Sequence, residues 1–295
     1  MITTKKFWIA IFVAPCMLLF CMIYAVPIVT VLYTSLCEYT AFTPPTLIGF
    51  DNFAYLFTDS DFLSAFSNTM LWVLLQTTVH VLIGLMMALI LYKKPFGWKF
   101  VRTAYMIPNI IPTAATGVMF FMLLNPTFGL VKTFYDTMGW DVNTVPNLFG
   151  NSKFSFITVT CTWIFYSAFN TIIFLAEIGS IPRDIFEAAR VDGAKDWQID
   201  FFITLPMLKN AISTCVILAT VAMVSQFDII YMTTRGGPGT STLNLPIYLY
   251  KTSTLESNYG MANAVGVIQI ILGLTLVLVI RKLFGTGDKK KGAGR

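Results

Sequence analysis

Six long apolar runs constrain this chain more than any other feature of its sequence. They cover residues 7–36, 65–91, 104–124, 154–179, 208–233 and 261–283. Each is long enough to cross the hydrocarbon core of a bilayer, which takes about 20 apolar residues. A backbone in lipid must satisfy its own hydrogen bonds, and the runs lack the alternation of barrel strands. The sequence therefore predicts an all-α membrane protein with six transmembrane helices.

The composition argues against several other classes of protein. Charged residues make up 12% of the chain, against about 25% in soluble domains, and disorder or nucleic-acid binding needs more polar or basic sequence. The five cysteines have no metal-ligand spacing, and the single histidine, His80, lies inside an apolar run. We expect no metal site, no catalytic residue and no resident cofactor. His80 is expected to pack or to make a polar contact inside the bundle.

Basic residues decide the expected orientation in the membrane. If the N-terminus is cytoplasmic, sixteen Lys and Arg residues lie on the inner side, and four lie on the outer side: Lys132, Lys153, Arg235 and Lys251. Both termini are therefore expected inside the cell, with residues 284–295 as a basic cytoplasmic tail. Residues 1–295 are expected to form a single transmembrane domain.

The segment between the fourth and fifth runs, residues 180–206, differs from an ordinary loop. Pro182 suits the first turn of a helix, Gly193 suits its end, and a second short helix is expected from Lys195 to about residue 202. Four aromatic side chains that a solvated loop does not need also lie here: Phe186, Trp197, Phe201 and Phe202. The sequence predicts a helix–glycine–helix knob, packed either on the chain's own helices or in a partner's groove.

Three motifs in this segment carry a family resemblance. Glu187-Ala188-Ala189, Asp192-Gly193-Ala194 and Leu205-Pro206 follow the pattern E-A-A-x-x-D-G-A and then I-x-L-P. The pattern resembles the EAA loop of permease subunits of binding-protein-dependent ABC importers. Arg235-Gly-Gly-Pro238 after Phe227-Asp228 is similar to the carbohydrate-uptake branch, and within it to the first-type permease subunit of maltose, multiple-sugar and glycerol-3-phosphate systems. The resemblance covers nearly the whole chain.

The resemblance implies a type I ABC importer permease bundle whose cytoplasmic loop couples it to a separate ATPase. The implied coupling residues are Glu187, Ala188, Ala189, Asp192, Gly193, Leu205 and Pro206. ATP and Mg would be bound by a cytoplasmic ABC ATPase dimer, so this chain would not itself be an enzyme. The other implied partners are a distinct homologous permease subunit, an extracellular solute-binding protein, a sugar and the lipid bilayer. The implied location is the cytoplasmic membrane of a bacterium or archaeon.

In maltose-type permeases two helix faces line the sugar site. The matching positions here are Thr162, Phe165, Tyr166, Ala222, Met223 and Gln226. Met223 and Thr162 stand where the maltose subunit has amides, which argues against maltose itself; the alternative for these side chains is packing or lipid contact. Asp228 is expected either to bind substrate or to hold Arg235 and the extracellular turn formed by Gly236, Gly237 and Pro238.

An ion-coupled secondary transporter of a small polar solute is the alternative function. It would use intramembrane carboxylates, and Asp228 and Glu177 are the candidates. Glu177 is expected to pair with a basic residue at the cytoplasmic face, with a proton-coupled role as the alternative. Small residues at the start of the sixth run predict close helix packing: Gly260, Ala262, Ala264 and Gly266.

Overall fold

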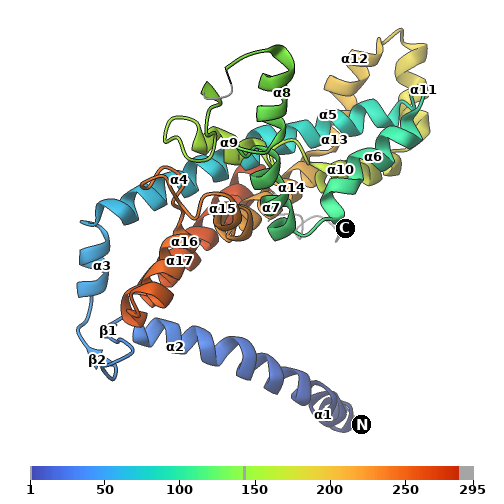
Figure 1. The fold of residues 1–295 in the computed structure, drawn as a ribbon. Helices are drawn as coiled ribbons and strands as arrows, with labels where there is room; N and C mark the ends of the chain where they lie inside the picture. Colours follow the sequence, from blue (N-terminus) through green and yellow to red (C-terminus); the bar gives the residue numbers. More distant parts are fainter. Residues whose placement is uncertain (1, 142–143, 286–295) are drawn as a thin grey trace. The chain divides into compact units, whose positions relative to one another are not determined.

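The computed structural model describes residues 2–141 and 144–285, which are mostly helical (Figure 1). Among these residues, three stretches are long and apolar enough to cross a membrane: Ile11–Thr34, Ser60–Tyr92 and Tyr259–Phe284. Two further pairs of helices pass the same test together but are bent, by 98° and 67°. A shorter apolar helix, α10 (Ala168–Ser180), covers the end of the fourth predicted run.

The chain divides into two compact units. The first comprises the residues up to 63 and residues 248–271, and the second comprises residues 64–247 and those from 272 onward. The first unit contains α1 (Ile2–Phe20), η1 (Cys21–Ala25), α2 (Val26–Thr34), β1 (Cys37–Glu38), β2 (Thr46–Leu47), α3 (Asp51–Leu56), η5 (Lys251–Leu255) and the first part of α17 (Tyr259–Phe284). Among the described elements, three helices have residues in both units: α4 (Ser60–Leu75), α16 (Leu245–Tyr250) and α17.

Small residues let the backbone approach closely in the first unit. The strands β1 and β2 pair antiparallel, with Cys37 opposite Leu47. A Cβ atom on Gly260 would lie 2.2 Å from the carbonyl oxygen of Cys37, so only glycine fits there. Ala262 and Ala264 are buried on the same helix. The predicted close packing at the start of the sixth run therefore lies, for Gly260, against this chain's own β1.

The second unit contains the last part of α17 and a further set of helices. They are η2 (Gln76–His80), α5 (Val81–Tyr92), α6 (Trp98–Ile110), α7 (Thr113–Leu123), α8 (Leu130–Met138), α9 (Ser155–Cys161), α10, α11 (Arg183–Val191), α12 (Asp196–Ile199), η4 (Asp200–Thr204), α13 (Leu205–Met207), α14 (Lys209–Val224) and α15 (Asp228–Thr233). Its core joins α5, α10 and α14 through buried side chains such as Leu85, Phe174 and Cys215. Gly84 of α5 lies directly against α10, because a Cβ there would be 2.8 Å from Cβ of Asn170.

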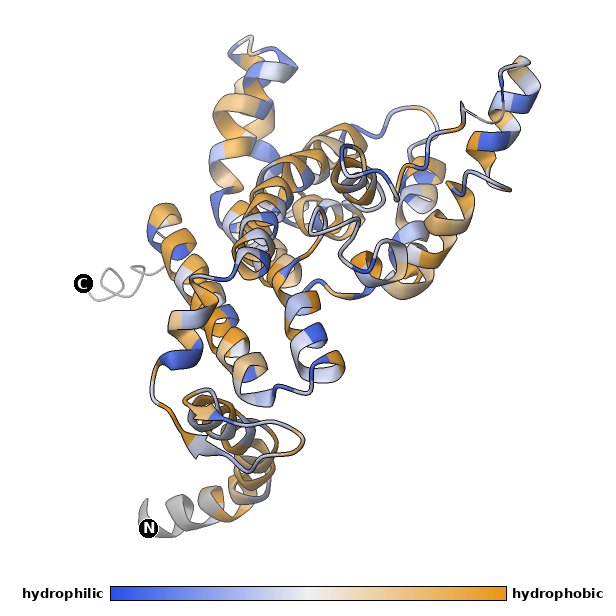
Figure 2. Ribbon diagram, turned by 60° about the vertical axis from the view of Figure 1, so that its left-hand side comes forward, coloured by the Kyte–Doolittle hydropathy of each residue, from blue (hydrophilic) through white to orange (hydrophobic). Residues whose placement is uncertain are grey.

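Helix α5 is apolar on both of its sides. Leu85 and Ala88 are buried in the core, whereas Leu82, Met86 and Ile90 are exposed, and Figure 2 shows that most of the helical ribbon is hydrophobic. A helix that is hydrophobic all round belongs in a large core or in lipid. The exposed face of α5 is therefore suited to contact with lipid.

Three of the predicted runs are interrupted in the structure. The third bends by 98° between α6 and α7, where Pro112 lacks a backbone N–H and Ile111 before it is extended, with ψ of 130°. The fourth is broken over residues 162–167, between α9 and α10, and the fifth over 225–227, between α14 and α15. The expectation of continuous helices over 104–124, 154–179 and 208–233 is corrected at these points.

Candidate functional site

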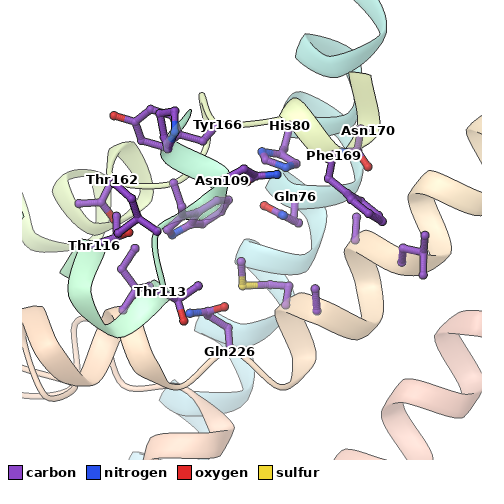
Figure 3. Close-up of a pocket in the computed structure, with 18 residues that line it drawn as sticks. Gln76, His80, Asn109, Thr113, Thr116, Thr162, Tyr166, Phe169, Asn170 and Gln226 are labelled. Atoms are coloured by element: carbon purple, nitrogen blue, oxygen red, sulfur yellow. The ribbon is translucent and has the colours of Figure 1, made fainter. Parts of the chain in front are cut away.

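A cavity of about 420 Å³ lies within the second unit (Figure 3). Its 18 lining residues come from η2, α6, α7, α10, α14, α15 and the interruptions between these helices. The labelled side chains in Figure 3 carry amide, hydroxyl, imidazole and aromatic groups. Interrupted helices are where membrane transporters usually bind their solutes, because backbone and side-chain polar groups become available there.

Five of the seven side chains predicted for the substrate path lie in this lining: Thr162, Tyr166, Ala222, Met223 and Gln226. Phe165 lies outside the lining and is 56% exposed. Asp228 also lies outside it, and its Oδ2 accepts a hydrogen bond of 2.7 Å from Oγ1 of Thr113, which is a lining residue. Residues of the fourth and fifth predicted runs therefore line the same cavity.

The interruption at residues 162–167 is held by side chains from distant helices. The hydroxyl of Tyr105 donates to the carbonyl of Phe165 and accepts from the amide of Ser167, at 2.9 and 3.1 Å. His80 Nδ1 lies 2.9 Å from the carbonyl oxygen of Ile164. These contacts satisfy backbone groups that the broken helix leaves without partners, which lipid cannot do.

Asn109 supports the same interruption from α6. With its amide group oriented to match its neighbours, it donates to the carbonyl of Tyr166 at 3.3 Å and accepts from the amide of Phe169 at 3.1 Å. Tyr166 and Phe169 are themselves lining residues. The break in the fourth run is therefore a specific structure that shapes one wall of the cavity.

Several lining residues escaped prediction from the sequence. They are Gln76, Asn109, Thr113, Thr116 and Asn170, together with His80, whose expected polar contact the structure places at Ile164. The signal that points to them is polarity inside an apolar run, because polar residues in membrane helices usually face the bundle interior. That rule gives the facing direction but not which helices converge on one cavity.

The loop after α10 begins with helix α11, whose end is defined by its hydrogen bonds. The amide of Gly193 donates to the carbonyl of Arg190 and that of Ala194 donates to the carbonyl of Ala189, at 3.0 and 2.9 Å. Gly193 has a φ of 79°. This is the Schellman arrangement, in which glycine takes the left-handed position. Asp192 is the exposed C-cap residue of the helix.

The two faces of this loop differ in burial. Its inner face is a cluster formed by Ile181, Phe186, Ala189 and Ile199. The predicted coupling residues Glu187 and Ala188 are exposed on α11, as are three aromatic side chains farther on: Trp197, Phe201 and Phe202. Phe186 and Ala189 thus pack on the chain itself, whereas Trp197, Phe201 and Phe202 are exposed, and their burial in a partner's groove stays a prediction.

Two contacts join the loop to the end of α5. The rings of Phe186 and Tyr92 have centroids 6.1 Å apart, and Nζ of Lys93 forms an ion pair of 2.6 Å with Oδ2 of Asp200. Beyond Asp200 the chain continues through Leu205 and Pro206 of α13, and then bends by 67° into α14. The loop therefore contacts one core helix and continues directly into another.

The turn containing Gly236, Gly237 and Pro238 is also well defined. Gly236 has a φ of 91°, and the bond between Gly237 and Pro238 is cis. The hydroxyl of Thr242 donates to the carbonyl of Gly237 at 2.8 Å. Arg235 lies with its guanidinium 5.8 Å from the ring centroid of Tyr231.

A basic partner is expected for Glu177 and, as one of two alternatives, for Asp228. In the described part of the chain, Asp228 bonds to Thr113 and makes no pair with Arg235. Glu177 is half-buried near the end of α10, and the basic partner expected for it is not seen among residues 2–141 and 144–285.

The family described as "Binding-protein-dependent transport system inner membrane component" matches residues 80–286 of this chain. The chain belongs to this family. The sulfoquinovosyl glycerol transport system permease protein SmoG of Agrobacterium fabrum is 32% identical to it over 93% of this chain and 89% of SmoG. The trehalose/maltose transport system permease protein MalF of Thermococcus litoralis is 28% identical over 87% of this chain and 86% of MalF.

A solved structure confirms the predicted fold for this family member. It is a crystal structure of a bacterial ABC transporter involved in the import of the acidic polysaccharide alginate. One of its chains matches with a TM-score of 0.83 over 97% of this chain and 98% of that chain, at 22% identity. The chain therefore has the helical fold of ABC importer permeases, and its apolar helices are those of a multi-pass membrane component.

Proposed function

We propose that this permease forms one half of the path by which a sugar or oligosaccharide is imported at the expense of ATP. Family membership supports the importer role, and the names of SmoG and MalF support a carbohydrate. The single observation that carries the proposal is the uncharged cavity, where aromatic side chains lie beside amides and hydroxyls. Such side chains match the apolar faces and the hydroxyl groups of a sugar.

In this proposal the segment 180–206 is a coupling loop. Glu187 and Ala188 contact a separate cytoplasmic ATPase, which binds ATP and Mg. When its dimer closes, the loop moves, and the movement reaches α5 through the Phe186–Tyr92 contact and the Lys93–Asp200 pair. Because α5 packs with α10 and α14 beside the cavity, this movement changes the access of the cavity to either side of the membrane.

The proposed assembly contains three further proteins. A distinct homologous permease subunit supplies the other half of the path, an ATPase dimer supplies energy, and an extracellular binding protein delivers the sugar. Residues 1–295 form one transmembrane domain with six spans, both termini lie in the cytoplasm, and the turn at Gly236, Gly237 and Pro238 faces outward. The predicted basic tail, 284–295, lies outside the described residues from 286 onward.

Uptake into proteoliposomes tests the function. The complex purified through a tag on this chain should import a sugar bound by its binding protein when ATP is enclosed, and an ionophore that collapses ion gradients should leave the rate unchanged. Uptake driven by a proton or sodium gradient without ATP would instead establish the alternative, an ion-coupled secondary transporter.

Reversing the exposed charge of the coupling loop is predicted to break the link to the ATPase. Glu187→Lys should reduce both ATP-driven uptake and sugar-stimulated ATP hydrolysis about ten-fold or more, because a like-charge contact in an interface costs several kcal/mol. The matched control is Asp136→Lys on α8, which is also an exposed acidic residue in a helix and should transport normally. Normal uptake by the Glu187→Lys complex would contradict the assignment of this loop.

A further inference from the structure

The second predicted run contains a π-helical turn at the cavity. The turn, η2, covers Gln76–His80 between α4 and α5, and its first and last residues both line the cavity. Figure 3 shows Gln76 and His80 directed from this one helix toward the space occupied by the other labelled side chains. Single π-helical turns inside α-helices are frequent at functional sites, because they re-aim side chains at the cost of regular hydrogen bonds.

The hydrogen bond of His80 determines what it offers to the cavity. Its Nδ1 lies 2.9 Å from the carbonyl oxygen of Ile164, and a carbonyl can only accept, so Nδ1 carries the proton. The neutral imidazole then has an unprotonated Nε2, which is a hydrogen-bond acceptor. His80 therefore combines a structural contact at one nitrogen with a free acceptor function at the other.

Two neighbouring groups are buried without a partner. They are Oε1 of Gln76 and Nε1 of Trp163, for which the described part of the chain offers no hydrogen bond. Trp163 also lines the cavity, and its ring centroid is 6.4 Å from that of His80. Buried polar groups are nearly always satisfied, so a donor and an acceptor beside a cavity indicate a ligand that supplies both functions.

The lining also limits the charge of such a ligand. None of its 18 residues is Lys, Arg, Asp or Glu. The carboxylate of Asp228 reaches the lining only through its hydrogen bond to Thr113. A carboxylate or sulfonate on the ligand would lose its hydration here and gain no opposite charge, which is costly.

We propose that Gln76, His80 and Trp163 form a subsite that binds hydroxyl groups of an uncharged sugar during its passage, an inference that rests on the proposed function. A hydroxyl both donates and accepts, so it donates to Oε1 of Gln76 or Nε2 of His80 and accepts from Nε1 of Trp163. The separation of His80 and Trp163 lets one sugar ring contact both. The part of the path lined by this chain gives an acidic sugar no opposite charge.

The test uses the purified importer complex in proteoliposomes with its own binding protein. The probes are maltose, trehalose and N,N′-diacetylchitobiose as uncharged sugars and an alginate trisaccharide as an acidic one. The measured quantity is the number of sugar molecules imported per ATP hydrolysed. Gln76→Leu and Trp163→Phe each remove one hydrogen-bonding group and should lower this ratio about five-fold for the sugar that is imported.

His80→Asn separates the two functions of the imidazole. The amide nitrogen of asparagine can replace Nδ1 in donating to Ile164, whereas the Nε2 acceptor is lost. This variant should keep the thermal stability of the wild-type complex and still lower the import ratio about five-fold. A fall in stability with an unchanged ratio would reduce His80 to a structural role and overturn its place in the subsite.

Trp72→Phe is the matched control for Trp163→Phe. The indole of Trp72 donates to Oγ1 of Thr160 inside the protein at 2.8 Å. Removing this hydrogen bond should lower the melting temperature and leave the import ratio unchanged. Equal import ratios in wild type, Gln76→Leu and Trp163→Phe, or faster import of the alginate probe than of every uncharged probe, would overturn the subsite. Uptake by the wild-type complex that is driven by a proton or sodium gradient without ATP would instead refute the proposed function itself.

Discussion

At Gly193 the backbone conformation itself limits the residues that the coupling loop accepts. Its φ is 79°, and a Cβ atom there would meet nothing within 4 Å, so a substitution costs strain rather than a clash. Gly193→Ala should cost about 1 kcal/mol. Gly193→Pro should cost more, since it also removes the donation to Arg190, and ATP-driven uptake should fall at least about ten-fold.

Gly139 offers the matched control for Gly193. It ends α8 with a φ of 70°, also in open space, so Gly139→Ala carries a similar strain away from the coupling loop. Melting temperature and uptake, measured together, separate strain from coupling. Loss of uptake in Gly139→Ala equal to that in Gly193→Ala would show that strain alone, and not the loop, is responsible.

Tyr248 gives a second prediction for a single residue, this time on pH. Its hydroxyl donates to Oδ2 of Asp59, and burial first, then that hydrogen bond and the charge of Asp59, raise the pKa of the phenol above its ordinary value of 10.0. The folded chain therefore holds this proton more tightly than the unfolded chain. The stabilisation is complete below about pH 10 and is lost as the pH rises above it.

The comparison with Tyr248→Phe measures this effect. The melting temperature of the wild-type protein should exceed that of the variant by a constant amount up to about pH 9, and the difference should shrink toward pH 11. A difference that stays constant or grows over this range would contradict the assignment.

Between elements, the contact of α5 with α10 depends on one glycine. A Cβ on Gly84 would lie 2.6 Å from Oγ of Ser167 and 2.8 Å from Cβ of Asn170. Gly84→Val should therefore force the helices apart and lower the free energy of unfolding by about 1–3 kcal/mol. Gly179→Ala on α10 is the control, since a Cβ there meets nothing within 4 Å, and it should be neutral or stabilising. Equal melting temperatures for the two variants would refute this packing.

Local chemistry made the helical structure at the start of segment 180–206 predictable. Pro182 precedes α11, and Gly193 ends it in the left-handed conformation, as the positions of proline and glycine in the sequence indicate. The interruption at residues 162–167 was not predictable in the same way. It has no proline or glycine, and it is held by His80, Tyr105 and Asn109 from other helices. Such a break depends on tertiary contacts, which no local pattern encodes.

At the scale of the whole molecule, the family resemblance pointed to several residues that line the cavity. It did not predict the cavity itself. Thr162 and Gln226 matched positions of a known sugar site, and both line the cavity. Gln76 lies on a helix that the resemblance did not connect with substrate, and only the arrangement of the second unit brings it to the same space. Phe165 matched the pattern, yet the break in its helix leaves it outside.

The central claim is that the segment 180–206 couples this permease to a nucleotide-hydrolysing partner. The most direct measurement places a photo-crosslinking amino acid at Ala188 in the purified complex, with position 136 on α8 as the control. The account predicts an adduct between Ala188 and the ATPase subunit, a yield that changes with nucleotide, and no such adduct from position 136. A complex that imports sugar with ATP while Ala188 forms adducts only with lipid or with its own chain would contradict it.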